Sequence, residues 1–274
     1  MKIAIQGEPG SFSHEAALKF VPDAEIVPCA LSAEVFAALD SGAADAAAIP
    51  IENSLAGSVL EHFDLLLHHN VRVVRETLLR IRHNLIAAPG SKLEDIRQVL
   101  SHPVALAQCR RFFAAHPAMT PSPFYDTAGA VKHTIELGDR AVAAIAGEQA
   151  ARAYNGLVLQ AGIEDNPANF TRFFLLRRSA QVHQQPDADK VSIAFSVKNR
   201  PGTLVSALQV FADHHTNLCK IESRPVHGQP WEYIFYVDFQ VADPAVPSAV
   251  LQQLKRQCLL VKELGYYPAA RLLS

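Results

Sequence analysis

The order of apolar and polar residues divides the chain into two parts with different rhythms. Over the first 178 residues, short apolar runs alternate with segments in which apolar residues recur every three or four positions. The first pattern is typical of strands and the second of amphipathic helices. This alternation predicts an α/β layer architecture with parallel strands. The clearest predicted strands and helices, in chain order, are 2–7, 14–20, 25–29, 32–42, 46–51 and 58–69.

The same rhythm repeats between about residues 80 and 158, and we interpret this repeat as a second lobe. The stretch "FTRFFLLRR", residues 170–178, predicts a strand that returns to the first lobe. The first lobe would then consist of about 1–79 and 159–178. Residues 1–178 are therefore predicted to form one two-lobed domain.

A different order of elements follows residue 178. Residues 179–190, "SAQVHQQPDADK", have no apolar period and predict a linker. Residues 191–274 then give strand, helix, strand, strand, helix and strand in fewer than about 90 residues, which is typical of a ferredoxin-like domain. We expect this tail to fold as a separate, smaller domain.

Composition and charge narrow the class of protein. The chain has 274 residues, of which 49% are hydrophobic, and a formal net charge of -2 without any basic run, which argues against a nucleic-acid partner. The start, "MKIAIQGEPGSF", lacks the apolar core and cleavage site of an export signal, and no segment reaches the length of a membrane span. The four cysteines are far apart and the histidines show no ligand spacing, so we expect a cytoplasmic protein without a metal site.

Candidate chemistry gathers in the turns that follow the predicted strands. In an open parallel sheet, ligands bind beyond the carboxyl ends of the strands, where helix amino termini favour anions. Four such turns carry glycine or hydroxyl residues, and together they would suit a small ligand with more than one carboxylate. The simpler alternative for each turn is an ordinary helix N-cap. The turns are 7–16, 51–62, 100–108 and 125–131, with Ser13, Ser58, Ser101 and Asp126 or Thr127 as the candidate caps.

Two pairs of residues are harder to explain as ordinary secondary structure. Glu52 and Asn53 directly follow an apolar strand, although neither residue favours strands. Thr171 and Arg172 lie between phenylalanines at the start of another strand, where they either cap the strand or do chemistry. A carboxylate in such a place could hold a substrate hydroxyl or act as a general acid.

Several motifs in this order resemble the prephenate dehydratase family. They are "GEPGSFSHEAA", "IPIENSLAGSV", "SHPVALAQC" and "NFTRF", while "RPGTLVSAL" and "ESRP" in the tail resemble the phenylalanine-responsive motifs of the ACT regulatory domain. The resemblance implies two α/β lobes around a cleft, like a type 2 periplasmic-binding protein, followed by a ferredoxin-like ACT domain. The resemblance is to the monofunctional form, since no chorismate mutase segment precedes the first strand.

The family's functional residues can be carried over position by position. Thr171 matches the catalytic threonine, and Glu52 would be a proton source nearby. If strand geometry were regular, Thr171 and Arg172 would point to opposite faces, so both could reach one ligand only at an irregular strand mouth. The other substrate-binding positions implied are Arg172, Phe173, Asn53, Ser54, Gly57, Ser58, Ser101, Gln108 and His14. The implied phenylalanine-binding positions are Asn199, Pro201, Gly202, Thr203, Leu204, Val205, Glu222, Ser223, Arg224 and Pro225.

The resemblance also implies an activity. It is a carbon–oxygen lyase reaction of phenylalanine biosynthesis, the decarboxylative dehydration of prephenate to phenylpyruvate, which needs no cofactor because aromatisation drives it. Phenylalanine would act as a feedback inhibitor through ACT domains paired in a dimer or tetramer. Thr203 stands where the family usually has alanine, a difference that bears on the affinity or specificity for the effector. Arogenate remains an alternative substrate, and a non-catalytic ligand sensor remains an alternative function.

Overall fold

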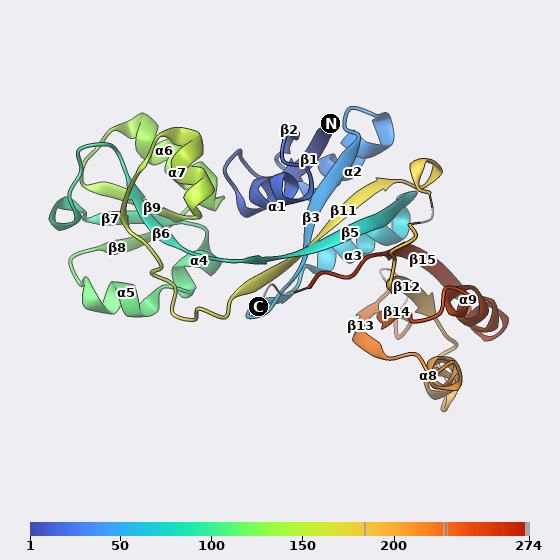
Figure 1. Ribbon diagram of the computed structural model, residues 1–274. Coiled ribbons are helices and arrows are strands. Elements are labelled where there is room, and N and C mark those ends of the chain that lie inside the picture. Colours follow the sequence, from blue (N-terminus) through green and yellow to red (C-terminus); the bar gives the residue numbers. More distant parts are fainter. Residues whose placement is uncertain (184, 227, 229, 272–274) are drawn as a thin grey trace. The chain divides into compact units, whose positions relative to one another are not determined.

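The computed structural model describes residues 1–271, except 184, 227 and 229. The chain forms two compact units, one made of Met1–His62 with Thr77–Leu175 and the other of Phe63–Glu76 with Leu176–Ser274. No helix of the described residues is both long and apolar enough to cross a bilayer. The fold is mixed α/β, with three separate sheets (Figure 1).

The first lobe is built on a sheet with the strand order β2-β1-β3-β11-β5, to which the short β4 adds by pairing with β3. Strands β1 and β2 are parallel, as are β1 and β3, as the alternating pattern predicts. Ile3, Ile5 and Ile49 on these strands are fully buried, which explains their apolar sequences. The strands are β1 (Lys2–Gln6), β2 (Glu25–Cys29), β3 (Ala46–Asn53), β4 (Gly57–Ser58), β5 (Val71–Arg80) and β11 (Phe170–Arg178); the helices are α1 (Phe12–Phe20), α2 (Ser32–Ser41) and α3 (Leu60–His68).

The second lobe has its own sheet, with the order β10-β6-β9-β7-β8. Strand β7 is parallel to β8 and β9, but β6 pairs antiparallel with β9, so the expectation of parallel strands is wrong for this part of the sheet. Alternate residues of β6 serve two different cores: Leu85 packs with Phe112 on one face, and Ile86 packs with Val131 on the other. Because both faces are covered by helices, the central strands β6 and β9 are buried along their whole length and are mainly apolar. The strands are β6 (Asn84–Ala87), β7 (Gln98–Ser101), β8 (Thr120–Pro123), β9 (Val142–Ala146) and β10 (Leu157–Gln160); the helices are α4 (Pro103–Ala107), α5 (Arg110–Ala115), α6 (Thr127–Leu137) and α7 (Glu148–Tyr154), with a 3-10 turn at Leu93–Asp95.

Two elements of this unit differ from the sequence pattern. The apolar spacing of 104–116 predicts one helix. This stretch instead forms two short helices, α4 and α5, because the chain turns at Gln108 and the side chain of Asp165 accepts hydrogen bonds from the first N–H groups of α5. Strand β10, which the pattern did not indicate, pairs antiparallel with β6. Each difference depends on a partner distant in sequence.

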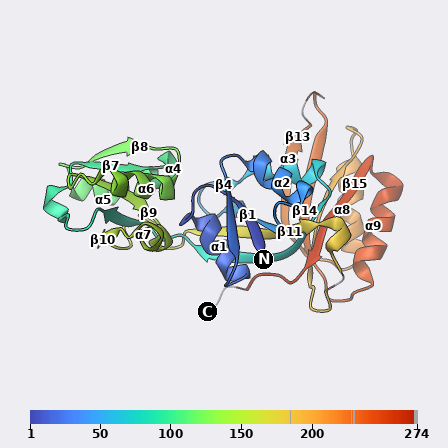
Figure 2. The same ribbon diagram turned by 90° about the horizontal axis from the view of Figure 1, so that it is seen from above.

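The second unit contains the βαββαβ order expected for the tail. Its sheet has the antiparallel order β13-β14-β12-β15, and α8 and α9 pack on a core that includes Phe195, Phe211 and Phe239. A short 3-10 turn, Ser179–Gln181, precedes this sheet. The elements are β12 (Lys190–Ser196), α8 (Thr203–Asp213), β13 (Leu218–Pro225), β14 (Tyr233–Gln240), α9 (Val246–Gln257) and β15 (Leu260–Tyr267), and Figure 2 shows them from above.

The same unit also holds the end of α3 and the start of β5. The Lys262 ammonium donates hydrogen bonds to the carbonyls of Leu66, Leu67 and His69, at 2.9, 2.8 and 2.7 Å. A helix ends with carbonyls that lack partners within the helix, and a cation there is favourable. The Tyr236 hydroxyl donates to the Phe63 carbonyl at 3.1 Å. Residues far apart in sequence therefore fold as one body here.

Candidate functional site

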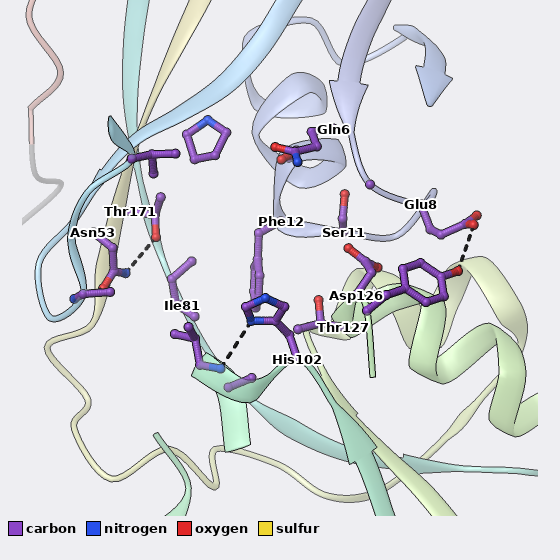
Figure 3. Close-up of a pocket in the computed structure, with 18 of the residues that line it drawn as sticks. Gln6, Glu8, Ser11, Phe12, Asn53, Ile81, His102, Asp126, Thr127 and Thr171 are labelled. Atoms are coloured by element: carbon purple, nitrogen blue, oxygen red, sulfur yellow. Dashed lines mark hydrogen bonds between the residues drawn. The ribbon is translucent and has the colours of Figure 1, made fainter. Parts of the chain in front are cut away.

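A cavity of about 610 Å³ lies in the first unit and is lined by both of its lobes. The first lobe contributes the glycine turn after β1, the end of β3 and the start of β11, and the second contributes the starts of α4 and α6 (Figure 3). This matches the sequence expectation that turns after strands line one site. The polar side chains on its wall belong to Gln6, Glu8, Ser11, Ser13, Asn53, His83, His102, Gln108, Tyr125, Asp126, Thr127 and Thr171.

Strand alternation decides which part of the "TRF" motif reaches the cavity. Strand β11 is regular from Phe170 onward, and Thr171 and Phe173 both line the cavity. Arg172 does not line it; this buried side chain lies 4.7 Å from the ring centre of Phe174, two residues along the same face. Its guanidinium is 3.9 Å from the carboxylate of Glu52, which also lies outside the cavity wall. The irregular strand mouth that would bring Thr171 and Arg172 to one ligand is therefore not formed.

Asn53 fixes the direction of the hydrogen bonds at Thr171. Its side-chain oxygen accepts from the N–H groups of Leu55 and Ala56, at 3.0 and 2.8 Å, so its amide nitrogen must face the other way. That nitrogen donates to the Thr171 hydroxyl oxygen at 2.9 Å and to the Asn169 side-chain oxygen at 2.7 Å. Because the Thr171 oxygen accepts a hydrogen bond, its own proton is left for another acceptor.

The same direction continues into the second lobe. The Asn169 amide nitrogen donates to the side-chain oxygen of Gln108 at 3.0 Å, and that oxygen lies 2.8 Å from His83 Nε2. Since the oxygen can only accept, His83 carries its proton on Nε2 and the Gln108 NH₂ group points away from this network. His83 is 2% exposed, and its Nδ1 has no hydrogen-bond partner among the described residues. Burial lowers the pKa of His83, which favours the neutral ring.

Helices α1 and α6 begin at the cavity and are capped differently. Ser11 caps α1 with a neutral hydroxyl that accepts from the His14 N–H. Asp126 caps α6 with a carboxylate oxygen that accepts from the Gly129 N–H at 2.7 Å. Burial raises the pKa of Asp126, while the backbone N–H groups at the start of α6 oppose that rise. One helix thus presents a neutral cap to the cavity and the other an acidic one.

Several residues predicted for the site support the wall from behind instead of lining it. The Ser54 hydroxyl donates to the Ala168 carbonyl at 3.1 Å, and the Ser101 hydroxyl donates to the Ile145 carbonyl at 2.6 Å. The cap predictions at Ser13 and Ser101 are wrong, since the caps of α1 and α4 are Ser11 and His102; the cap at Asp126 is confirmed. The predicted residues outside the wall are His14, Glu52, Ser54, Gly57, Ser58, Ser101 and Arg172.

His83 and His102 line the cavity but were not predicted to belong to it. His83 begins an apolar stretch that reads as an ordinary strand, and its only sequence signal is a polar His-Asn pair before that strand. His102 lies within the motif "SHPVALAQC", from which the family resemblance implies only Ser101 and Gln108 as site residues.

The two motifs of the second unit lie at the same end of its sheet. Ser196, at the end of β12, and Arg224, near the end of β13, both pair with Ile234 of the strand between them. Gly202 begins α8 with φ of +83°, and the Thr203 hydroxyl donates to the Lys198 carbonyl at 2.6 Å. The effector residues predicted from sequence therefore come from neighbouring parts of one surface.

Arg224 makes a further contact within this unit. Its Nε donates to a carboxylate oxygen of Asp64, on α3, at 2.9 Å, and a second hydrogen bond joins the same two groups. Two parallel bonds between a guanidinium and a carboxylate fix both side chains. The "ESRP" motif is thus tied directly to α3.

Comparison with known proteins gives concordant matches. A family model described as prephenate dehydratase matches residues 3–181, and one described as ACT domain matches residues 191–259. The chain is 39% identical to arogenate dehydratase/prephenate dehydratase 2 of Arabidopsis thaliana, over 98% of this chain and 73% of that protein. It is 36% identical to the bifunctional chorismate mutase/prephenate dehydratase of Aquifex aeolicus, over 99% of this chain and 75% of that protein.

Two solved structures superpose on nearly the whole chain. The prephenate dehydratase of Arthrobacter aurescens in complex with L-Phe superposes with a TM-score of 0.88 at 32% identity, covering 98% of this chain and 90% of that one. A structure described as GqqA, a novel type of quorum quenching acylase, superposes with a TM-score of 0.89 at 33% identity, covering 98% of each chain. The cavity described above therefore lies in the part of the chain that the first family model covers.

Proposed function

Since this chain belongs to the prephenate dehydratase family and carries an ACT domain, we propose that it converts prephenate to phenylpyruvate in phenylalanine biosynthesis, under feedback control by phenylalanine. The family establishes a dehydratase of the lyase class, and the particular reaction is the proposal. The observation that carries it is the hydroxyl of Thr171, which lines a cavity between two lobes and is oriented by Asn53.

The enzyme has to position the substrate and assist the departure of its ring hydroxyl. Prephenate loses its ring hydroxyl and the ring carboxylate together: the carbon–carboxylate bond breaks, its electrons form the aromatic system, and the carbon–oxygen bond breaks toward hydroxide. A hydrogen bond donated to the departing oxygen stabilises the hydroxide as it forms, and the hydroxide takes its proton from solvent to become water. Aromatisation provides the driving force, and a positioned donor typically contributes about 10²- to 10⁴-fold.

Thr171 is the group we assign to the departing hydroxyl. Its oxygen accepts a hydrogen bond from Asn53, so its own hydroxyl proton is available to the substrate. The side chain is 8% exposed, and the surrounding wall keeps bulk water from competing for that hydrogen bond. Donation in the ground state and in the transition state uses the same geometry, and it strengthens as negative charge develops on the departing oxygen.

Gln108 and His83 would hold the substrate in register. The network fixes the Gln108 oxygen as an acceptor from Asn169 and His83, which leaves its NH₂ group to bind a substrate oxygen. His83 then acts as a positioning residue, because it touches Gln108 rather than the reacting atoms. For Glu52 and Arg172 we propose the same kind of role: they pair beside the strand mouth and hold β3 and β11 in place, so Glu52 is not the proton source.

The domain assignment follows the family models. We propose that 1–178 is the catalytic domain, that 179–190 is the linker and that 191–274 is the regulatory ACT domain. The phenylalanine complex of the Arthrobacter aurescens relative supports an effector role for phenylalanine in this chain. The effector would bind where the 199–205 and 222–225 motifs meet, between ACT domains of two copies, in the cytoplasm.

The experiment measures phenylpyruvate formation from prephenate by the purified chain, with and without phenylalanine. Turnover that falls with phenylalanine is the expected result. The variant Thr203→Ala, which restores the usual alanine, serves as a control that keeps turnover. No turnover of prephenate by folded protein would contradict the proposal.

A further inference from the structure

The charges on the cavity wall do not suit a substrate that is only negative. Among the described residues that line the cavity, Glu8 and Asp126 are acids, and none is a lysine or arginine. Prephenate carries two carboxylates and no positive group. Arogenate has the same skeleton with an ammonium in place of the keto oxygen, so it brings one positive charge into the cavity.

Glu8 is already balanced by its neighbours. Lys132 on α6 lies 3.3 Å from one carboxylate oxygen of Glu8, and the Tyr125 hydroxyl donates to the other at 3.2 Å. Glu8 therefore adds little net charge to the cavity, and Asp126 is the acid whose charge no described cation balances by an ion pair.

Asp126 reverses the usual preference of a helix amino terminus. The start of a helix normally favours anions because its first N–H groups lack partners. At α6 those groups already bond the carboxylate of Asp126, whose oxygen accepts from Gly129 at 2.7 Å. A substrate carboxylate would be repelled at this helix, whereas it would not be at α1, which Ser11 caps with a neutral hydroxyl.

Asp126 lies where the two lobes meet at the cavity, so it can contact a bound substrate. Figure 3 shows it between Ser11 of the first lobe and Thr127 of the second, among the side chains that line the cavity. Its second carboxylate oxygen lies against Gly7, where a Cβ would come within 2.8 Å of it. Gly7, with φ of +97°, thus gives the carboxylate room on the side of the first lobe.

From these observations we infer that Asp126 is a specificity-determining residue: it binds the substrate ammonium group, and the chain uses arogenate with a higher kcat/KM than prephenate. The inference rests on the proposed function, since it concerns the same cavity and the same loss of carbon dioxide and hydroxide. The product from arogenate is phenylalanine itself. The α1 start and the Gln108 NH₂ group then remain for the substrate carboxylates.

The test compares kcat/KM for arogenate and prephenate in the wild type, Asp126→Asn and Asp126→Ser. Both replacements keep a side-chain oxygen that can cap α6, so folding should survive, and a thermal melt checks this. We expect the wild type to favour arogenate at least about tenfold, equivalent to about 1.4 kcal/mol. Both variants should lose most of that preference, mainly through a higher KM for arogenate. Glu136→Gln removes an equal charge from the exposed side of α6 and should leave the ratio unchanged.

The outcomes separate two failures. If prephenate and arogenate are both used and the ratio is the same in wild type and Asp126→Asn, the specificity role is wrong while the proposed function stands. The inference would be overturned if the wild type prefers prephenate and Asp126→Asn retains that preference. That result would mean that a protonated Asp126 donates a hydrogen bond to the keto oxygen of prephenate. Turnover of neither substrate would overturn the proposed function and the inference with it.

Discussion

The cavity of the first unit and the effector motifs of the second unit use their side chains in opposite ways. In the cavity, Asn53, Asn169 and Gln108 bond one another, and Thr171 is almost completely buried. Around the motifs, Val205 is 69% exposed and Trp231 is 75% exposed. Where exposed apolar side chains form a contiguous patch, they mark a surface that binds another protein. The cavity is thus assembled within one chain, whereas we expect the effector surface to be completed by a second copy.

The strongest test of the cavity is the removal of one hydroxyl. Thr171→Val keeps the shape of the side chain and should lower kcat by about a hundredfold or more, because the proton donor is lost. Thr134→Val is a matched control, since Thr134 is fully buried and its hydroxyl has no partner among the described residues. Steady-state kinetics on both proteins would settle the matter: equal activity in the two variants would return Thr171 to a structural role.

The next effect tests the network behind the cavity. His83→Leu removes the donor that holds Gln108, so we expect a roughly tenfold loss of kcat/KM, mostly through KM. His83→Gln can place an amide N–H near the same position and should recover much of the loss. In a Gln108→Leu background, His83→Leu should have little further effect. Equal damage in both backgrounds, or no rescue by glutamine, would show that His83 only fills space.

Acidification should lower the stability of the first unit through its buried histidines. His62 and His83 are 0% and 2% exposed, and burial lowers the pKa of each. An unfolded histidine titrates near pH 6.5, so below that pH the unfolded chain binds protons that the folded chain does not. The free energy of unfolding should therefore fall as the pH decreases from 7 toward 5, by at most about 1.4 kcal/mol per pH unit for each group. Urea unfolding of the wild type and of His62→Gln/His83→Gln checks this, and an equally steep decline in the double variant would contradict it.

A charge on the effector surface should separate regulation from turnover. Val205→Glu puts a carboxylate on a largely exposed position of α8, so the fold should tolerate it. If a second copy covers this surface, phenylalanine should inhibit about fivefold less well while uninhibited kcat stays the same. Inhibition curves at two protein concentrations measure both effects. Unchanged inhibition at both concentrations would mean that Val205 remains uncovered in the regulated state.

The smallest effect is expected at Thr203. Its hydroxyl donates to the carbonyls of Lys198 and Arg200, at 2.6 and 2.9 Å, and both bonds are local. Thr203→Ala should change the phenylalanine concentration for half inhibition by less than about threefold, since the replaced bonds are exposed and worth little. A larger change in the inhibition curve would show that the hydroxyl contacts the effector.

Local sequence pattern was sufficient for the elements that depend on local order. The alternation of the first 178 residues predicted the parallel pairing of β1 with β2 and β3 and of β7 with β8 and β9, but not the antiparallel pairing of β6 with β9. The pattern of the tail predicted the βαββαβ order. Local pattern could not show that 104–116 splits, because the cap of α5 is the carboxylate of Asp165, 55 residues away from Arg110. Pattern also could not place Arg172, since only the observed regularity of β11 shows which alternate residues face the cavity.

Site residues that belong to a sequence motif were predictable, whereas residues that only the fold brings to the site were not. Asn53, Gln108, Thr171 and Phe173 were expected from the motifs, and they line the cavity. His83 was missed because its role depends on a contact with Gln108 that forms only when two parts of the second lobe meet Asn169, just before the start of β11. A buried imidazole with one bonded nitrogen has no signature in the sequence alone.

The contact of Lys262 with the last carbonyls of α3 bears on how such proteins can be recombined. A regulatory module that exchanges freely between enzymes should end at its linker, and the linker here would be the natural place for a fusion. In this chain, however, the last carbonyls of α3, a helix that the prephenate dehydratase model covers, accept from Lys262 on β15, the last strand of the chain. A chimera that joins a foreign regulatory domain after residue 190 would leave the last carbonyls of α3 without this cation unless the foreign domain carries an equivalent lysine. Compatible domains should therefore be recognisable by a lysine at the position of Lys262.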